Sequence, residues 1–83
     1  MVNIKMFKFQ TILSGYGNWA ANLFKEDAHI GGIGIQEEFL YVNIHKGKEL
    51  TTKEIMLLFT QLLQNDSSLL DKKFEINIVE EVK

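Results

Sequence analysis

The segment from Thr51 to Leu63 constrains the fold most, because it carries the strongest helix pattern in this chain of 83 residues. Thr51 and Glu54 have the spacing of a capping box, in which an N-cap hydroxyl and a third-position carboxylate each bind a backbone N–H group. The apolar residues that follow recur at helical spacing and form one face of an amphipathic helix. They are Ile55, Leu58, Phe59, Leu62 and Leu63. A helix of this kind must bury that face against another element.

The rest of the chain has the alternation of β-strands on both sides of this helix. We predict strands over residues 2–13, 19–25, 28–35, 39–45 and 73–79, separated by short polar or glycine-containing turns. A short helix is the alternative for 19–25, since its alanines and leucine are good helix formers. In the first segment the apolar face switches near Met6 and Phe7, which predicts a bulge or a strand covered on both sides. The sequence therefore predicts an α+β protein of order β-β-β-β-α-β, with one mostly antiparallel sheet and the helix packed on one face.

The chain is predicted to form one small domain over residues 1–83, since it contains no linker and no internal repeat. A chain of this length buries only about 60% of its unfolded surface, and without cysteine it has no disulfides to add stability. Small domains of this kind often gain stability by oligomerising. Met56 and Leu57 widen the apolar face of the helix, which is typical of a second contact such as a subunit interface. We therefore expect a homo-oligomer.

The charge balance is slightly acidic, with 9 lysine and arginine residues against 11 aspartate and glutamate residues. This balance argues against a nucleic-acid partner, because broad binding to the phosphate backbone needs a basic face. No apolar run approaches the roughly 18 residues of a membrane-spanning helix. The first residues also lack the basic and apolar regions of a signal peptide. Together with the absence of cysteine, these features predict a cytoplasmic protein with no membrane partner.

The predicted strand 28–35 contains three glycines, Gly31, Gly32 and Gly34. Glycine weakens a strand, and inside one it usually marks a bulge or the close approach of a ligand or another backbone. A turn and a further strand follow, so the glycines are not a dinucleotide-binding fingerprint. Two interpretations remain open. The glycines either make room for bulky neighbours such as Trp19, Phe39 or Tyr41, or they present backbone N–H groups to a ligand, including an anionic one.

The two histidines, His29 and His45, both fall on predicted strands. On adjacent antiparallel strands facing residues lie about 5 Å apart, so the two rings could meet. They are then either polar contacts of a ligand pocket or ordinary surface or hydrogen-bonded histidines. No further ligand stands at a metal-binding spacing, and we predict no metal.

The turn over residues 14–18 places Tyr16 at its centre and Trp19 directly after it. It is either a plain hairpin loop or a site where these rings stack on a planar ligand or anchor a partner. Catalysis has little support, because the chain has no cysteine nucleophile and no serine in a nucleophile-elbow pattern. The histidines also lack metalloprotease spacing. We predict a protein that is not an enzyme and has no catalytic residues.

Two stretches carry a resemblance to a known family. Ala28-His29-Ile30-Gly31-Gly32-Ile33 precedes a strand, and His45-Lys46-Gly47-Lys48-Glu49-Leu50 leads into the helix. Over residues 28–79 this arrangement resembles the small chaperone-like subunit associated with prenylated-flavin decarboxylases. The resemblance implies a non-enzymatic module that handles a flavin phosphate, with His29, Gly31, His45 and Lys46 as ligand contacts. The family's downstream Gly-Ile-His element has no counterpart in 75–79.

The predicted function is a small ligand-binding module that holds or sequesters an anionic or nucleotide-like ligand at the glycine-rich strand. It would act as a cofactor chaperone or a signal-molecule sponge, and the pattern names no particular cofactor. The predicted contacts are His29, Gly31, Gly32, Gly34, His45, Lys46 and Lys48, with Tyr16 or Trp19 as a stacking face. The alternative is a phage- or mobile-element-encoded anti-defence protein that binds and inhibits a host protein. Its interface anchors would be Phe39, Tyr41 and Trp19.

Overall fold

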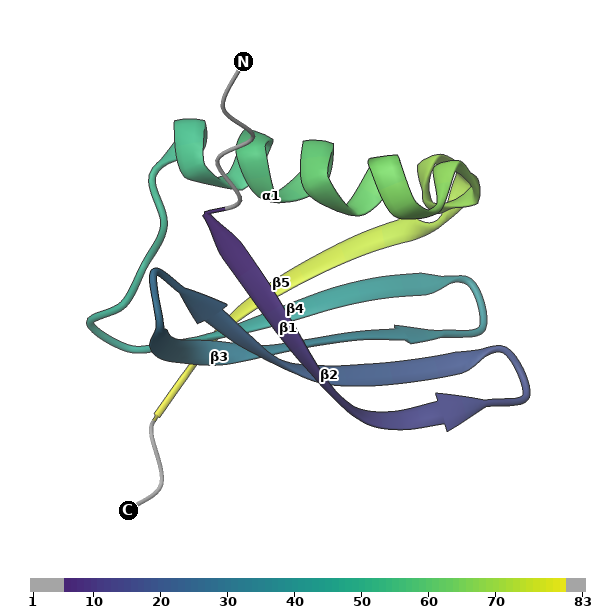
Figure 1. The fold of residues 1–83 in the computed structure, drawn as a ribbon, viewed down its shortest axis with the longest axis horizontal. Coiled ribbons are helices and arrows are strands. Elements are labelled where there is room, and N and C mark those ends of the chain that lie inside the picture. The colour runs from purple at the N-terminus through teal and green to yellow at the C-terminus, as the bar shows by residue number, and fades with distance from the viewer. Residues whose placement is uncertain (1–5, 81–83) are drawn as a thin grey trace.

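A five-stranded sheet carries one helix across one of its faces in the computed structural model, which describes residues 6–80 (Figure 1). The elements in chain order are β1 (Phe7–Gly15), β2 (Asn18–Lys25), β3 (Ala28–Gln36), β4 (Phe39–His45), α1 (Thr52–Asn65), the short 3-10 helix η1 (Ser67–Asp71) and β5 (Lys73–Val79). The strands lie side by side in the order of the sequence. Neighbours from β1 to β4 are antiparallel, and β5 runs parallel to β4. The predicted fold class and element order are confirmed.

The predicted strand boundaries hold with small differences. Segment 19–25 is a strand and not a short helix, because it is paired along its length with β1 and β3. Residues 2–5 of the first predicted strand lie outside the described residues, and β1 extends past Leu13 to Gly15. Its register shifts between Thr11 and Leu13, not near Met6 and Phe7 as we predicted. The apolar alternation predicted the wrong position for the bulge because Ile12 and Leu13 are apolar and yet both exposed, so neither marks a buried face of the strand.

The core lies between α1 and the middle strands of the sheet. Paired residues on neighbouring strands share a face, so Leu23, Ile33 and Val42 all point toward the helix. Leu58 and Leu62 of α1 are buried against this layer, as the helical spacing predicted. Within residues 6–80 no element covers the opposite surface of the sheet, which we call the open face. The sheet therefore has one face that α1 covers and one open face.

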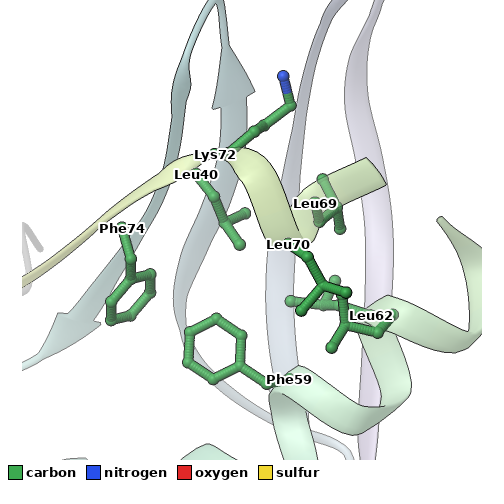
Figure 2. A pocket seen from close by; sticks show the side chains of 8 residues that line it. Leu40, Phe59, Leu62, Leu69, Leu70, Lys72 and Phe74 are labelled. Carbon is green, nitrogen blue, oxygen red and sulfur yellow. The ribbon is translucent and has the colours of Figure 1, made fainter. Parts of the chain in front are cut away.

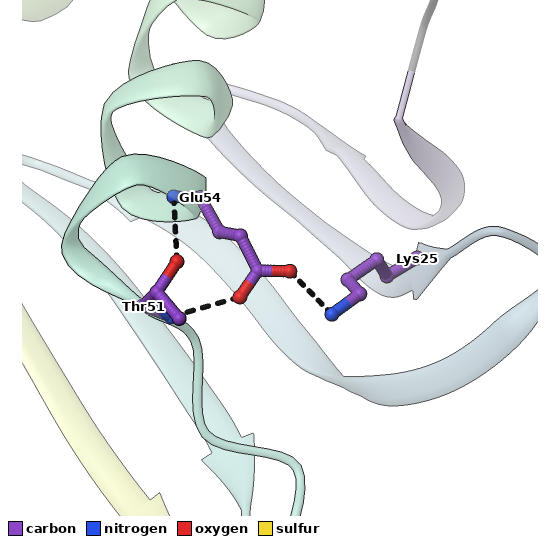
Figure 3. Close-up of polar contacts among 3 residues, drawn as sticks. All are labelled: Lys25, Thr51 and Glu54. Atoms are coloured by element: carbon purple, nitrogen blue, oxygen red, sulfur yellow. Dashed lines mark hydrogen bonds and ion pairs between the residues drawn. The ribbon is translucent and has the colours of Figure 1, made fainter.

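Polar contacts fix the helix at its N-terminal end (Figure 3). Thr51 Oγ1 accepts a hydrogen bond from the Glu54 N–H at 3.1 Å, and Glu54 Oε1 accepts one from the Thr51 N–H at 2.8 Å. The predicted capping box is therefore confirmed. Lys25 Nζ donates to the other carboxylate oxygen of Glu54, which ties the start of α1 to the end of β2. This contact and the Thr51 N–H lower the pKa of Glu54 to about 2.

A second polar contact joins the helix to the first strand. Gln61 Nε2 donates to the Phe7 carbonyl at 2.5 Å, and the Phe7 N–H donates to Gln61 Oε1 at 3.3 Å. The Gln61 side-chain amide thus makes the two hydrogen bonds that a neighbouring strand would otherwise make with the Phe7 backbone.

Among the described residues, none of the helical segments has the length and hydropathy needed to cross a bilayer.

Replacing Thr51 by alanine should lower the free energy of unfolding by about 1 kcal/mol, because the capping hydrogen bond at the helix N-terminus is lost. Urea denaturation followed by circular dichroism measures this change. Thr52→Ala is the matched control, since Thr52 is the first helical residue and lies outside the capping box. That variant should stay within about 0.5 kcal/mol of the wild type. Equal losses in the two variants would contradict a specific role for the Thr51 hydroxyl.

The low pKa of Glu54 predicts that stability falls in acid. The pKa of its carboxyl group is about 2 in the folded chain, against an ordinary value of 4.5. The unfolded chain therefore binds this proton more readily, and the stabilisation is complete above about pH 4.5 and is lost as the pH falls toward 2. Glu54→Gln should show a shallower loss of unfolding free energy over this range in urea denaturation. Parallel pH profiles for the variant and the wild type would count against this assignment.

Candidate functional site

The open face carries a row of amide side chains that crosses the whole sheet. Strand register places Gln10, Asn22, Gly32, Asn43 and Asn77 side by side, one from each strand. Asn22 Nδ2 donates to Gln10 Oε1 at 3.2 Å, and Asn77 Nδ2 donates to Asn43 Oδ1 at 3.3 Å. The row is thus two amide pairs with a glycine between them. Asn22 Oδ1 and Asn43 Nδ2 have no hydrogen-bond partner within residues 6–80 and flank Gly32.

The three glycines of β3 have different surroundings. A side chain on Gly31 would begin 1.9 Å from the backbone oxygen of Asn43, so this position has no room for one. At Gly34 a side chain would begin 2.3 Å from the ring of Tyr41, which packs over the glycine from the neighbouring strand. At Gly32 the nearest atom is the Ala21 backbone oxygen at 3.5 Å, an ordinary contact distance.

These distances divide the two interpretations of the glycine strand. Close packing accounts for Gly31 and Gly34, and the ring over Gly34 is that of Tyr41, one of the neighbours that we expected, and not that of Trp19 or Phe39. Packing does not account for Gly32, where a side chain would fit and none is present. Gly32 is therefore half-buried, with free space over its backbone on the open face that an approaching molecule could occupy.

The two histidines meet at one end of the open face. The rings of His29 and His45 are edge to face with centroids 5.0 Å apart, and the ring of Phe24 lies 5.2 Å from that of His29. A register shift in the β2–β3 pair, between Leu23 and Phe24, brings His29 opposite Phe24. His45 Nδ1 is buried from solvent and has no hydrogen-bond partner in the described part of the chain. This imidazole nitrogen is available to a polar group that enters the cluster.

Charged groups surround the histidine cluster. Asp27 lies two residues before His29 but pairs with Lys8 Nζ at 2.6 Å, and this contact holds the pKa of the Asp27 carboxyl below its usual value. Lys46 follows His45 directly and has its Nζ 3.6 Å from Glu80. Lys48 is exposed in the same loop, and its N–H donates to the His45 carbonyl at 2.9 Å. Both lysines therefore lie at the histidine end of the sheet.

Tyr16 and Trp19, the predicted stacking residues, lie elsewhere. Tyr16 is at the tip of the β1–β2 turn and is fully exposed. Trp19 lies on the helix side of the sheet, where its ring is 5.9 Å from Phe9 and its Nε1 donates to Thr11 Oγ1. Phe24 is the fifth residue after Trp19 on β2, a distance of about 17 Å along a strand. The aromatic groups on the open face itself are Phe24, Tyr41 and Phe39.

The sequence analysis missed Asn22 and Asn43 as candidate site residues. Asparagine is depleted in strands, and two of them in register with a strand glycine are a usable signal. Recognising it requires the register of three strands, which the sequence alone did not give. Phe24 was also missed, because it reaches the histidines only through the shifted register of β2 and β3.

Within residues 6–80 no group of three or more histidine, cysteine, aspartate or glutamate side chains is arranged to hold a metal ion. Compared with known proteins, the chain matches no family model, no curated protein and no solved structure.

Alanine substitutions should separate the packing glycine from the exposed one. Gly31→Ala is expected to lower the unfolding free energy by about 2 kcal/mol or more, because the new methyl group collides with the Asn43 backbone. Gly32→Ala should change it by less than about 1 kcal/mol, since its nearest contact is already at an ordinary distance. Thermal and urea denaturation measure both. Equal destabilisation by the two substitutions would assign Gly32 to packing as well.

Proposed function

We propose that this protein is a non-enzymatic module that binds a planar, polar ligand of the nucleotide or flavin-phosphate class on its open face. The observation that carries the proposal is the open space over the half-buried backbone of Gly32, flanked by one unpartnered amide atom from each neighbouring strand. Ligand sites combine a flat apolar or backbone surface with a few placed polar groups that fix orientation.

Gly32 supplies the surface on which a ring would lie. Without a side chain there, an aromatic ring can rest directly on the β3 backbone, between the side chains of Asn22 and Asn43. Asn22 offers a free acceptor and Asn43 a free donor, and the edge of a nucleobase or flavin ring carries partners for both. Tyr41 lies one row further along, where it can bound the ring on the side away from the histidines.

The histidine end supplies contacts for an anionic group. His45 lies two residues after Asn43 on β4, about 7 Å along the strand. That separation suits a ligand whose ring lies over Gly32 and whose phosphate reaches the cluster. His29, His45, Lys46 and Lys48 are all at this end, and the two lysines carry positive charge. The resemblance to flavin-associated chaperone subunits implies the same ligand class and shares His29, His45 and Lys46 as contacts.

The alternative, an inhibitor of a host protein, would use a different surface. Its expected anchors Phe39 and Tyr41 share the open face, but Trp19 lies on the helix side. Trp19 and Tyr41 line one small hollow of about 140 Å³ at the end of the sheet, and Phe39 is not part of its lining. The open face therefore favours a small ligand over a protein partner at this position.

A ligand panel in a thermal shift assay tests the proposal. Flavin mononucleotide, riboflavin, adenosine monophosphate and adenosine serve as probes, and their paired members differ by one phosphate. A probe present at 100 times its dissociation constant should add about 2.7 kcal/mol of stability and raise the melting temperature by roughly 10–20 °C. Loss of the phosphate should weaken the shift. No shift from any member, confirmed by calorimetric titration, would refute the proposed ligand class.

Variants locate the binding site. Gly32→Val should fold and lose the ligand-induced shift, because the side chain occupies the floor on which the ring would lie. Asn43→Ala should weaken binding by about tenfold, the cost of one hydrogen bond of roughly 1.4 kcal/mol. Gln64→Ala is the control, since this amide is exposed on α1 away from the open face. Unchanged binding by Gly32→Val would place the ligand elsewhere.

A further inference from the structure

The edge strand β5 presents apolar side chains that the helix covers incompletely. Its register with β4 places Phe74, Ile76 and Ile78 on the helix side of the sheet. Each of the three remains more than 40% exposed, although their neighbours on β4 are buried. The exposed apolar surface continues on the same side of the molecule in Leu70 and in Met56, which lies one helical turn before Phe59. We call this surface the β5 seam.

A groove lies at one end of the β5 seam, beside Leu70 and Phe74 (Figure 2). It has a volume of about 340 Å³ and lies between α1, η1 and the start of β5. In Figure 2 the rings of Phe59 and Phe74 lie next to each other in its lining, edge to face with centroids 4.6 Å apart. Leu70 stands at its rim and is 71% exposed. An apolar surface of this extent beside a sheet edge is typical of an interaction site.

The backbone of β5 alternates between its neighbour β4 and the outer edge. The Lys73 N–H donates to the Glu38 carbonyl at 2.7 Å, and the Val79 carbonyl accepts from Lys46 at 2.8 Å. Odd-numbered residues of β5 therefore point their N–H and C=O groups toward β4. Phe74, Ile76 and Ile78 point theirs outward, where the sheet formed by the described residues ends. The same three residues thus expose both backbone hydrogen-bonding groups and apolar side chains.

We propose that β5 pairs antiparallel with β5 of a second copy of this chain, on a two-fold axis through Ile76. This register places Phe74 opposite Ile78 of the partner subunit and joins the two sheets into one. The three outward-facing residues of each strand would exchange about six hydrogen bonds, two for each facing pair. Both helices then lie on the same side of the joined sheet, and the two β5 seams meet between them.

Charge and polarity select this register among those that use the outward-facing groups. Lys72 and Glu80, which lie directly before and after β5, become opposite each other at both ends of the paired strands. On the open face, Glu75 lies opposite Asn77 of the partner subunit. Shifting the axis to Glu75 would set two carboxylates face to face, and shifting it to Asn77 would set Phe74 opposite Glu80 of the partner subunit. The strand sequence is therefore self-complementary about Ile76.

Light scattering over a range of concentrations tests the self-association. The expected mass is about 19 kDa, twice the 9.6 kDa of the chain. Ile76→Pro should give a folded monomer, because the N–H that it removes points to the outer edge and has no partner within β4. Leu57→Lys is the control, since this exposed residue lies one helical turn before Gln61, on the side of α1 that contacts β1, and should leave the dimer intact. A wild-type chain that stays at 9.6 kDa at millimolar concentration would overturn the proposal.

Single cysteines test the register, since the chain contains no cysteine of its own. Ile76→Cys places two thiols on the two-fold axis, where facing Cα atoms are about 5.5 Å apart and within disulfide range. Oxidation should link this variant at least tenfold faster than Glu75→Cys or Asn77→Cys, whose thiols would be offset along the strands. Equal rates for the three variants, or faster linking at 75 or 77, would overturn the proposed axis. None of these readouts depends on a ligand, so their failure is separate from failure of the proposed function.

Discussion

The burial of α1 on the middle of the sheet is the interaction on which the rest of the structure depends. Leu58 and Leu62 are buried against a layer formed by Leu23, Ile33 and Val42. This contact covers the middle of one face of the sheet with α1 and leaves the other face open. Because strand side chains alternate, it also decides which residues of each strand reach the open face. The amide row, the exposed glycine and the histidine cluster all follow from that single choice of face.

The glycines show how packing and exposure divide within one strand. Gly31 and Gly34 lack side chains because the Asn43 backbone and the Tyr41 ring occupy the space that those side chains would need. β3 is an interior strand, so its backbone groups are used by β2 and β4 on both sides. This arrangement leaves little role for exposed N–H groups in binding an anion. What the strand offers at Gly32 is a flat surface, and the polar contacts come from side chains on its two neighbours.

Much of the fold follows from local patterns in the sequence. Strict alternation in 39–45 predicted β4 to the residue, and the capping box placed the start of α1 correctly. Positions that depend on register did not follow. The bulge near Ile12 and the shift between Leu23 and Phe24 arise from pairing between strands, and the apolar periodicity within one strand cannot predict them. The meeting of the two histidines was foreseeable because both lie on adjacent antiparallel strands. The contribution of Phe24 was not foreseeable, because it depends on the shifted register.

Trp19 illustrates a further limit of reasoning from residue type. A tryptophan beside a glycine-rich turn is as consistent with an exposed stacking surface as with a core residue. Its side of the sheet depends on the register with Ile35, which packs against the core from β3. The residue type indicated that this ring makes strong aromatic contacts, but only the pairing of the strands determined on which face of the sheet the ring lies.

The edge strand combines two surfaces through the same alternation. Even-numbered residues of β5 are apolar and face the helix side, while Glu75 and Asn77 face the open side and continue the polar surface there. Pairing at this edge would cover the apolar residues without covering the open face. In a two-fold dimer both open faces would then lie on one side of a continuous sheet, opposite the two helices. Self-association and ligand binding could therefore occur together, because they use opposite faces of the same strands.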